Sequence, residues 1–320
     1  MRQEEKYLAI KELHEEKGYP IKALCDILDL NRSSYYKWLN RDASEQEAKD
    51  ADLIEKIINL YQESNGIFGY RRMQLNLKRR YGLHCNKKRV YRVMRVIGLK
   101  SVIRRKRPNY VKSTPEVTAE NVLNRNFGAE TFNEKWLTDV TEFKFGEGSK
   151  LFLSAILDLK DKGIISYMIG NRNTNKLVFD TFDAAVEKHP GASPLFHSDR
   201  GFQYTSRFFK AKLDAACMTQ SMSRVGCCID NGPMEAFWGI VKAEMFYLQR
   251  FDDYDSLKMA IEGYVDFYNN NRYQEKLGGL APLEYREMLL QKSRRALASE
   301  MANRTAPCLE SADAFTIALT

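Results

Sequence analysis

The sequence lacks the segments and motifs that mark secreted, membrane and zinc-binding proteins. Residues 1–6 contain no apolar signal core, and no apolar run approaches the roughly 18 residues of a membrane-spanning helix. The six cysteines are scattered and include no Cys-x-x-Cys pair, which argues against a paired-cysteine zinc site. We therefore expect a cytoplasmic protein with reduced thiols and no membrane partner.

Acidic residues are missing between Glu63 and Glu116, although the whole chain has a formal charge of only +8. Basic residues are frequent in this stretch, and their positive field favours binding to a polyanion such as DNA over the alternative of a merely solvated surface. The residues expected to contact DNA here are Arg71, Arg72, Arg79, Arg80, Lys87, Lys88, Arg89, Arg92, Arg95, Arg104, Arg105, Lys106 and Arg107.

A chain of 320 residues with 44% apolar and 12% aromatic residues has the composition of a soluble globular protein and the length of two or three domains. We predict a helix-turn-helix module over 1–45, a basic helical module over 50–112 and a linker over 113–133. A catalytic core follows over 134–290, and a tail over 291–320. The tail is rich in Ala and Ser from Arg294 on, and we expect it to be poorly ordered.

The first 39 residues have the spacing of three short helices, predicted over 3–17, 21–28 and 32–39. The third helix follows a tight polar turn and offers Arg32 and Lys37 to phosphates and base edges, as in a helix-turn-helix. Such a unit can instead serve only in packing or dimerisation. A polar linker is predicted over 40–52, then a helix from Leu53 and basic helices over 71–81 and 87–97.

From residue 134 the pattern changes to strands. Three antiparallel strands are predicted over 135–145, 151–159 and 163–170, followed by a helix over 174–187 and a strand over 194–198. A helix over 206–216, a strand over 218–223, a helix that contains Glu235 and a helix over 251–269 complete the core. This order is that of a ribonuclease-H-like sheet, so the predicted fold class is α/β with all-α helix-turn-helix modules ahead of it.

Three carboxylates stand out in this core. Asp139 lies in an alternating strand pattern, Asp199 directly follows a short apolar strand, and Glu235 lies in the first turns of an amphipathic helix, with thirty-five residues between the last two. Such oxygens suit two Mg²⁺ ions, which stabilise the entering and leaving oxygens of a phosphodiester in transfer. Mn²⁺ is the alternative metal. We expect all three to be catalytic metal ligands.

Several nearby residues have other interpretations. Asp158 is the main alternative metal ligand, but we expect it to cap a turn. Asp230 could replace Glu235 by position alone, but we expect it to cap the helix that carries Glu235. His197 is expected to be structural or to order water, because two-metal chemistry needs no histidine base. Lys242, seven residues past Glu235, is predicted on the same helical face and in contact with DNA. The residues predicted on the opposite, core-facing side are Phe237, Val241 and Leu248.

The chain resembles DDE transposases and retroviral-type integrases, and most closely the insertion-sequence-three family of bacterial transposases, the second-reading-frame (OrfB) product. The resemblance is carried by Trp-Leu-Thr-Asp-Val-Thr around Asp139, by His-Ser-Asp-Arg-Gly-Phe-Gln-Tyr around Asp199, and by Asp-Asn ahead of Glu235. Gly-x-x-Gly-Tyr-Arg-Arg and a closing Tyr-Asn-x-x-Arg motif extend it. Gln274 stands where many relatives have His, which puts a metal or acid-base role there in doubt.

The resemblance implies an enzyme that binds the ends of its own mobile element, cleaves there with metal-bound water and joins the 3′ hydroxyl to a target strand. Its partners would be double-stranded DNA at the element ends and target, a second copy in a homodimer or larger assembly, and the product of an upstream reading frame joined by frameshifting. Its location would be the bacterial cytoplasm, on the nucleoid. The alternatives are a nuclease without strand transfer and an inactive relic acting as a DNA-binding repressor.

Overall fold

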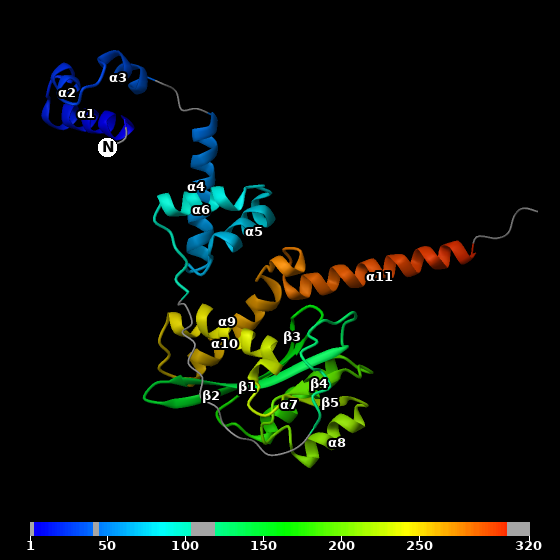
Figure 1. Ribbon diagram of the computed structural model, residues 1–320. Helices are drawn as coiled ribbons and strands as arrows, with labels where there is room; N and C mark the ends of the chain where they lie inside the picture. The colour runs from blue at the N-terminus through cyan, green and yellow to red at the C-terminus, as the bar shows by residue number, and fades with distance from the viewer. Residues whose placement is uncertain (1–2, 41–44, 104–118, 306–320) are drawn as a thin grey trace, which may run out of the picture. The chain divides into compact units, whose positions relative to one another are not determined.

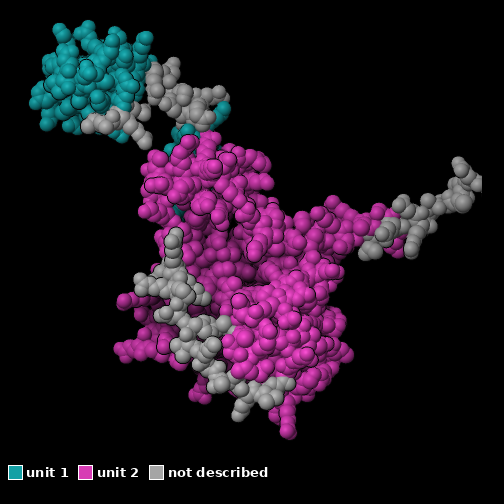
Figure 2. Space-filling view, in the orientation of Figure 1, with its two compact units in different colours: residues 1–62 teal, residues 63–320 magenta. Residues whose placement is uncertain are grey.

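The computed structural model describes residues 3–40, 45–103 and 119–305 (Figure 1). The chain forms two compact units, residues 1–62 and 63–320 (Figure 2). The predicted arm over 104–107, including Arg104, Arg105, Lys106 and Arg107, lies outside the described residues. The finer division into five segments stays a prediction.

The first unit contains α1 (Gln3–Lys17), α2 (Ile21–Ile27), α3 (Arg32–Leu39) and most of α4 (Glu45–Glu63). The Asn31 side chain accepts a hydrogen bond from the Ser33 amide at 2.8 Å and so caps α3. The three predicted helices are present, and a buried cluster joins them; it comprises Tyr7, Ile10, Leu24, Cys25 and Tyr35. The predicted linker over 40–52 is wrong from Glu45 on, because this polar segment is rich in helix formers and begins α4.

The second unit opens with the basic helices α5 (Tyr70–Tyr81) and α6 (Lys87–Val96). Gly82 ends α5 with a φ of 67°, a left-handed conformation that glycine adopts without a side-chain clash. The Asn86 side chain caps α6 by accepting from the Lys88 amide at 2.9 Å. Both helices have the predicted bounds to within one residue. α6 buries one apolar face, formed by Val90, Val93 and Met94.

A five-stranded sheet forms the centre of this unit. Its strands are β1 (Lys135–Phe145), β2 (Ser149–Asp158), β3 (Ile164–Gly170), β4 (Leu195–Ser198) and β5 (Thr219–Met222), in the order β3-β2-β1-β4-β5. β1 pairs antiparallel with β2 and parallel with β4, and Leu137 lies opposite His197. Along the chain the elements follow the predicted ribonuclease-H-like order, three strands and then alternating helices and strands.

Helices cover both faces of the sheet because side chains alternate along β1. Trp136 packs with α7 (Asn175–Lys188) and α8 (Arg207–Ala215), whereas Leu137 packs with α9 (Gly232–Glu244) and α10 (Tyr254–Asn270). Figure 1 shows the two helix pairs on opposite sides. Short 3₁₀ turns, η1 (Cys228–Asn231), η2 (Phe246–Leu248) and η3 (Glu275–Leu277), connect the later elements.

The last helix, α11 (Pro282–Thr305), extends into the predicted tail. The expectation of poor order from Arg294 is therefore wrong as far as Thr305. Ala, Glu, Arg and Met are strong helix formers, so the backbone stays helical although the side chains there are mostly exposed. No helix in the described part of the chain is long and apolar enough to span a membrane.

Candidate active site

Asp139 and Asp199 lie at the same edge of the sheet. β1 and β4 run parallel with Leu137 opposite His197, so two residues further along, Asp139 on β1 meets Asp199 just beyond β4. Burial, followed by the charge of Asp199, raises the pKa of Asp139 to about 7, and Glu235 adds a smaller effect in the same direction. Two carboxylates that are far apart in the sequence therefore share one electrostatic site.

Each aspartate is held by a specific donor. The indole Nε1 of Trp238 donates to Asp139 Oδ2 at 2.9 Å, and this bond opposes the rise of the Asp139 pKa. The Gly201 amide donates to Asp199 Oδ1 at 2.8 Å, while burial raises the pKa of Asp199. Sequence reasoning did not identify Trp238; its position three residues after Glu235, on the same helix, was the available signal.

Glu235 reaches this edge because the start of α9 is tied to β1. The Asn231 side-chain amide donates to the Thr138 carbonyl at 3.0 Å, next to Asp139 in the chain. Glu235 follows in the first turn of α9 and is half-buried. Within the described ranges, however, no three Asp, Glu, His or Cys side chains converge closely enough to form a metal-binding group. The structure thus brings the two aspartates together and places Glu235 near them, short of a closed three-residue cluster.

The chain matches the family model of an HTH-like domain over residues 47–107. It also matches two models of an integrase core domain, one over residues 129–228 and one over 235–290. It is 40% identical to transposase InsK of the insertion sequence element IS150 of Escherichia coli over 269 residues, which cover 84% of this chain and 94% of InsK. It is 30% identical to transposase InsF of insertion sequence IS3A of the same species, over 88% of this chain and 98% of InsF.

The chain belongs to the insertion-sequence-three family of DDE transposases. A solved structure of the HTLV-2 integrase catalytic core in complex with magnesium is 20% identical and covers 49% of this chain and 97% of that one. Its TM-score of 0.38 is too low to carry weight beside the sequence relatives. The transposase is therefore a DNA-acting enzyme with an integrase core, and nothing in the comparisons favours the repressor alternative.

Lys242 of the transposase lies on α9 with its ammonium 5.3 Å from the centre of the Phe143 ring, and it is half-buried. Phe237 and Val241 are buried in the core, as predicted. Leu248 is not: it is 37% exposed, because α9 ends at Glu244 and Leu248 belongs to η2.

The rival residues have structural partners. Asp158 accepts from the Asn133 and Lys160 amides, as a turn cap does, and also from Arg286 Nη2 at 2.9 Å. His197 is fully buried, its ring nitrogens lie 2.9 and 3.1 Å from the Ser221 and Ser223 hydroxyls, and burial lowers its pKa to about 4. These contacts agree with a structural role for both residues.

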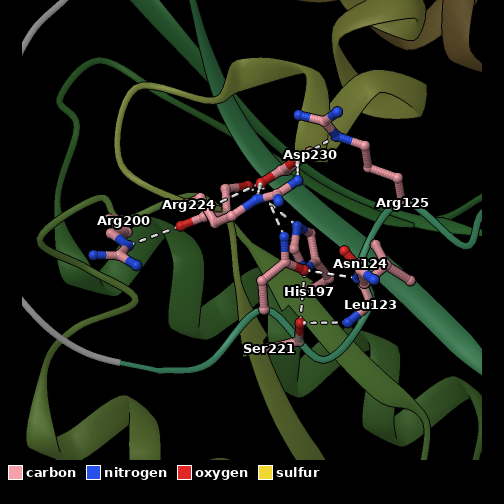
Figure 3. Close-up of polar contacts among 10 residues, drawn as sticks. Leu123, Asn124, Arg125, His197, Arg200, Ser221, Arg224 and Asp230 are labelled. Atoms are coloured by element: carbon pink, nitrogen blue, oxygen red, sulfur yellow. Dashed lines mark hydrogen bonds and ion pairs between the residues drawn. The ribbon is translucent and has the colours of Figure 1, made fainter.

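The expected helix-capping role of Asp230 is wrong. Asn231 precedes α9 without a side-chain cap bond, and the Asp230 carboxylate binds Arg224 and Arg125 instead (Figure 3). The sequence Asp-Asn-Gly-Pro is typical of a helix start. Arg224 lies six positions before Asp230 and Arg125 lies 105 positions before it, so neither belongs to that four-residue pattern.

Most of the predicted DNA contacts are accessible. Arg32 and Lys37 are exposed on α3. Those exposed on α5 and α6 are Arg71, Arg79, Arg80, Lys88, Arg92 and Arg95, and Lys87 and Arg89 are half-exposed. Arg79, Arg80 and Lys87 form surface ion pairs with Glu284, Glu63 and Glu275.

Arg72 is the exception among the predicted DNA contacts. Its side chain is 19% exposed and donates to the buried Glu244 carboxylate at 3.1 Å. The guanidinium is therefore used inside the protein, and the prediction that it contacts DNA is wrong for this structure.

Proposed function

We propose that the transposase binds the ends of its mobile element and uses Asp139, Asp199 and Glu235 to cleave DNA there and join the 3′ end to a target strand. The observation that supports this most directly is the pairing of Asp139 with Asp199 at one sheet edge, with Glu235 on the adjacent helix. Two half-buried carboxylates side by side are unfavourable unless they serve to hold cations or protons.

The residues fit divalent metal ions by their chemistry. All three donors are carboxylates, the hard oxygen ligands that Mg²⁺ and Mn²⁺ take together with waters and substrate phosphates. Burial, followed by the charge of Asp199, raises the pKa of Asp139, and bound cations would stabilise the charged carboxylates against both effects. We assign Asp139 and Asp199 to hold the ions, with Glu235 completing the set. Two bound Mg²⁺ ions would supply an activated water and stabilise the charged phosphate oxygens.

The chain's own residues prepare this site. Trp238 and the Gly201 amide each fix one carboxylate oxygen, so both aspartates are oriented before substrate arrives. On α6 the exposed side chains Lys88, Arg92 and Arg95 follow one another at helical spacing and can bind phosphates or base edges. Lys242 lies on the catalytic helix, where its charge suits the passing DNA backbone.

The partners follow from the reaction. Joining two element ends requires two catalytic sites, so we infer a homodimer or larger assembly on double-stranded DNA, with the upstream-frame product as a further partner. Its substrate locates the transposase in the bacterial cytoplasm on the nucleoid.

A strand-transfer assay with labelled terminal DNA and Mg²⁺ tests the proposal. Wild-type protein should yield joined products, whereas cleavage without joining would indicate a nuclease, and binding alone a relic. Asp199→Asn should abolish joining and keep end binding within a few-fold, because it removes charge without changing shape. Asp214→Asn, in an exposed ion pair on α8, is the matched control and should join normally. Joining by Asp199→Asn would remove Asp199 from the site.

A further inference from the structure

Three arginines gather around residues 223–231, the connection from β5 to α9 (Figure 3). Arg200 follows Asp199 directly, Arg224 is the second residue of the connection, and Arg125 comes from the segment before β1. The Arg125 and Arg224 side chains are 45% and 47% exposed. None of the three belongs to the basic stretch of α5 and α6, so the catalytic core carries a separate group of positive charges.

Asp230 binds two of these arginines, Arg125 and Arg224. Its side chain is fully buried, and it accepts from Arg224 Nε and Nη2 at 2.9 Å each and from Arg125 Nε at 2.7 Å. The Asn121 side chain and the Arg224 amide add two more hydrogen bonds. The bonds from Arg224 hold the pKa of Asp230 well below its usual range, so the carboxylate stays charged and fixes both guanidinium planes.

The same contacts leave outward-facing donors. Arg200 uses Nε to donate to the Ser223 carbonyl at 2.8 Å, which leaves both of its Nη groups. Arg125 likewise uses only Nε, and Arg224 retains Nη1. No acceptor in the described part of the chain contacts these remaining nitrogens. Asp230 pairs with Arg125 and Arg224 only, so the three arginines and this one carboxylate carry a net charge of +2 (3 − 1) and attract anions.

The cluster lies beside the catalytic carboxylates. The Ser223 amide donates to the Ser198 carbonyl at 2.9 Å, which ties the connection to the end of β4, one residue before Asp199. At its other end, Asn231 bonds to the Thr138 carbonyl, one residue before Asp139. A DNA strand whose phosphate reaches the two aspartates therefore passes this edge of the sheet.

We propose that Arg125, Arg200 and Arg224 bind the phosphodiester backbone of the DNA that enters the catalytic site, and that Asp230 is the positioning residue that orients Arg125 and Arg224. This inference rests on the proposed function and adds a backbone-binding surface to it. Guanidinium groups suit this task because their planar donors match two phosphate oxygens at once. An Asp230 that only stabilised the fold would have no effect on DNA binding by folded protein.

The test measures the dissociation constant of full-length protein for terminal DNA as a function of salt, together with strand transfer. Arg200→Gln and Arg125→Gln should each weaken binding roughly tenfold and lower the salt slope by about 1, because each loses a phosphate contact. Arg295→Gln, on the exposed part of α11, removes the same charge and should bind within about twofold of wild type. Joined product should fall together with binding.

Asp230→Asn separates orientation from net charge. The substitution makes the protein more positive, so a purely electrostatic surface would bind DNA more tightly, whereas loss of orientation predicts weaker binding. Its folding is checked by circular dichroism; if it does not fold, Arg125→Lys carries the test, because a lysine keeps the charge but has no planar guanidinium for Asp230 to orient. That variant should recover only part of the affinity lost in Arg125→Gln. If wild type joins DNA but the Arg200 and Arg125 variants bind terminal DNA as tightly as Arg295→Gln, this inference is refuted and the proposed function is not. Wild type that joins no DNA would refute the proposed function instead.

Discussion

Glu244→Gln should strongly destabilise the catalytic core. The Glu244 carboxylate is 4% exposed and accepts from Arg272 Nε and Nη2 at 2.9 and 2.8 Å, from Arg72 Nη1 at 3.1 Å and from the Tyr264 hydroxyl at 2.7 Å. Arg272 is itself only 8% exposed. A neutral side chain of the same shape would leave the Arg272 charge buried without its counter-ion.

The expected loss is about 3 kcal/mol of the free energy of unfolding, the lower end of the range of about 3–5 kcal/mol for breaking a buried pair, because Gln keeps one acceptor oxygen. Burial alone would raise the pKa of Glu244, but the bonds and charges of Arg272 and Arg72 outweigh it and lower the pKa below its usual 4.5. Its stabilising effect is therefore complete above that value and is lost as the pH falls through the lowered one.

Urea denaturation followed by tryptophan fluorescence is the measurement, since Trp136 and Trp238 both lie in the core. Glu262→Gln is the matched control: Glu262 lies on α10 in an exposed pair with Lys258 at 4.0 Å and should cost less than about 0.5 kcal/mol. A loss below about 1 kcal/mol for Glu244→Gln, or equal losses for both variants, would refute the argument from buried charge.

Two further predictions concern the aspartates. Gly201→Ala should lower joining by roughly tenfold or more while keeping the fold. The new Cβ would lie 3.0 Å from Asp199 Oδ1 and 2.9 Å from Gln203 Oε1, and so it would displace the Asp199 carboxylate. Unchanged joining rates would show that the site tolerates the shift. Mg²⁺ affinity, measured by calorimetry, should be about tenfold weaker near pH 6 than near pH 8, because Asp139 with a pKa of about 7 must lose its proton to bind a cation; an affinity independent of pH would contradict that pKa. The same raised pKa means that Asp139 contributes stability to the metal-free protein below its unfolded value of 3.8, and that this contribution is lost as the pH rises through about 7.

Local patterns were sufficient to predict much of the fold. α3 and β1 have the bounds expected from the sequence, since Asn31 caps one and apolar alternation marks the other. Asp139 was predicted within a strand and Asp199 directly after one, and the parallel pairing of β1 with β4 brings the two together. Apolar residues repeat every 2 positions in a strand and every 3.6 positions in a helix that packs on the core, so such elements can be predicted from the sequence.

Contacts between distant segments were not predictable in this way. Arg72 reads as a DNA-binding residue in a basic helix, yet its partner Glu244 is 172 positions away. Asp230 reads as a helix cap, and its partner Arg125 is 105 positions away. Leu248 has helical spacing with Val241, but α9 ends before it. In each case the local pattern was correct as a pattern, but an ion pair with another segment or the end of a helix determined the residue's actual role.

The position of β1 inside the sheet determines which of the acids can shift during the reaction. Asp139 lies opposite Ala155 on β2, and its strand pairs with β4 as far as Leu137, two residues before it, so pairing in the sheet fixes its backbone. Asp199 begins a turn, and Glu235 follows a connection held by side-chain bonds. Any tightening of the trio around a loaded substrate must therefore come from the β5–α9 connection and its helix, with Asp139 as the stationary reference point.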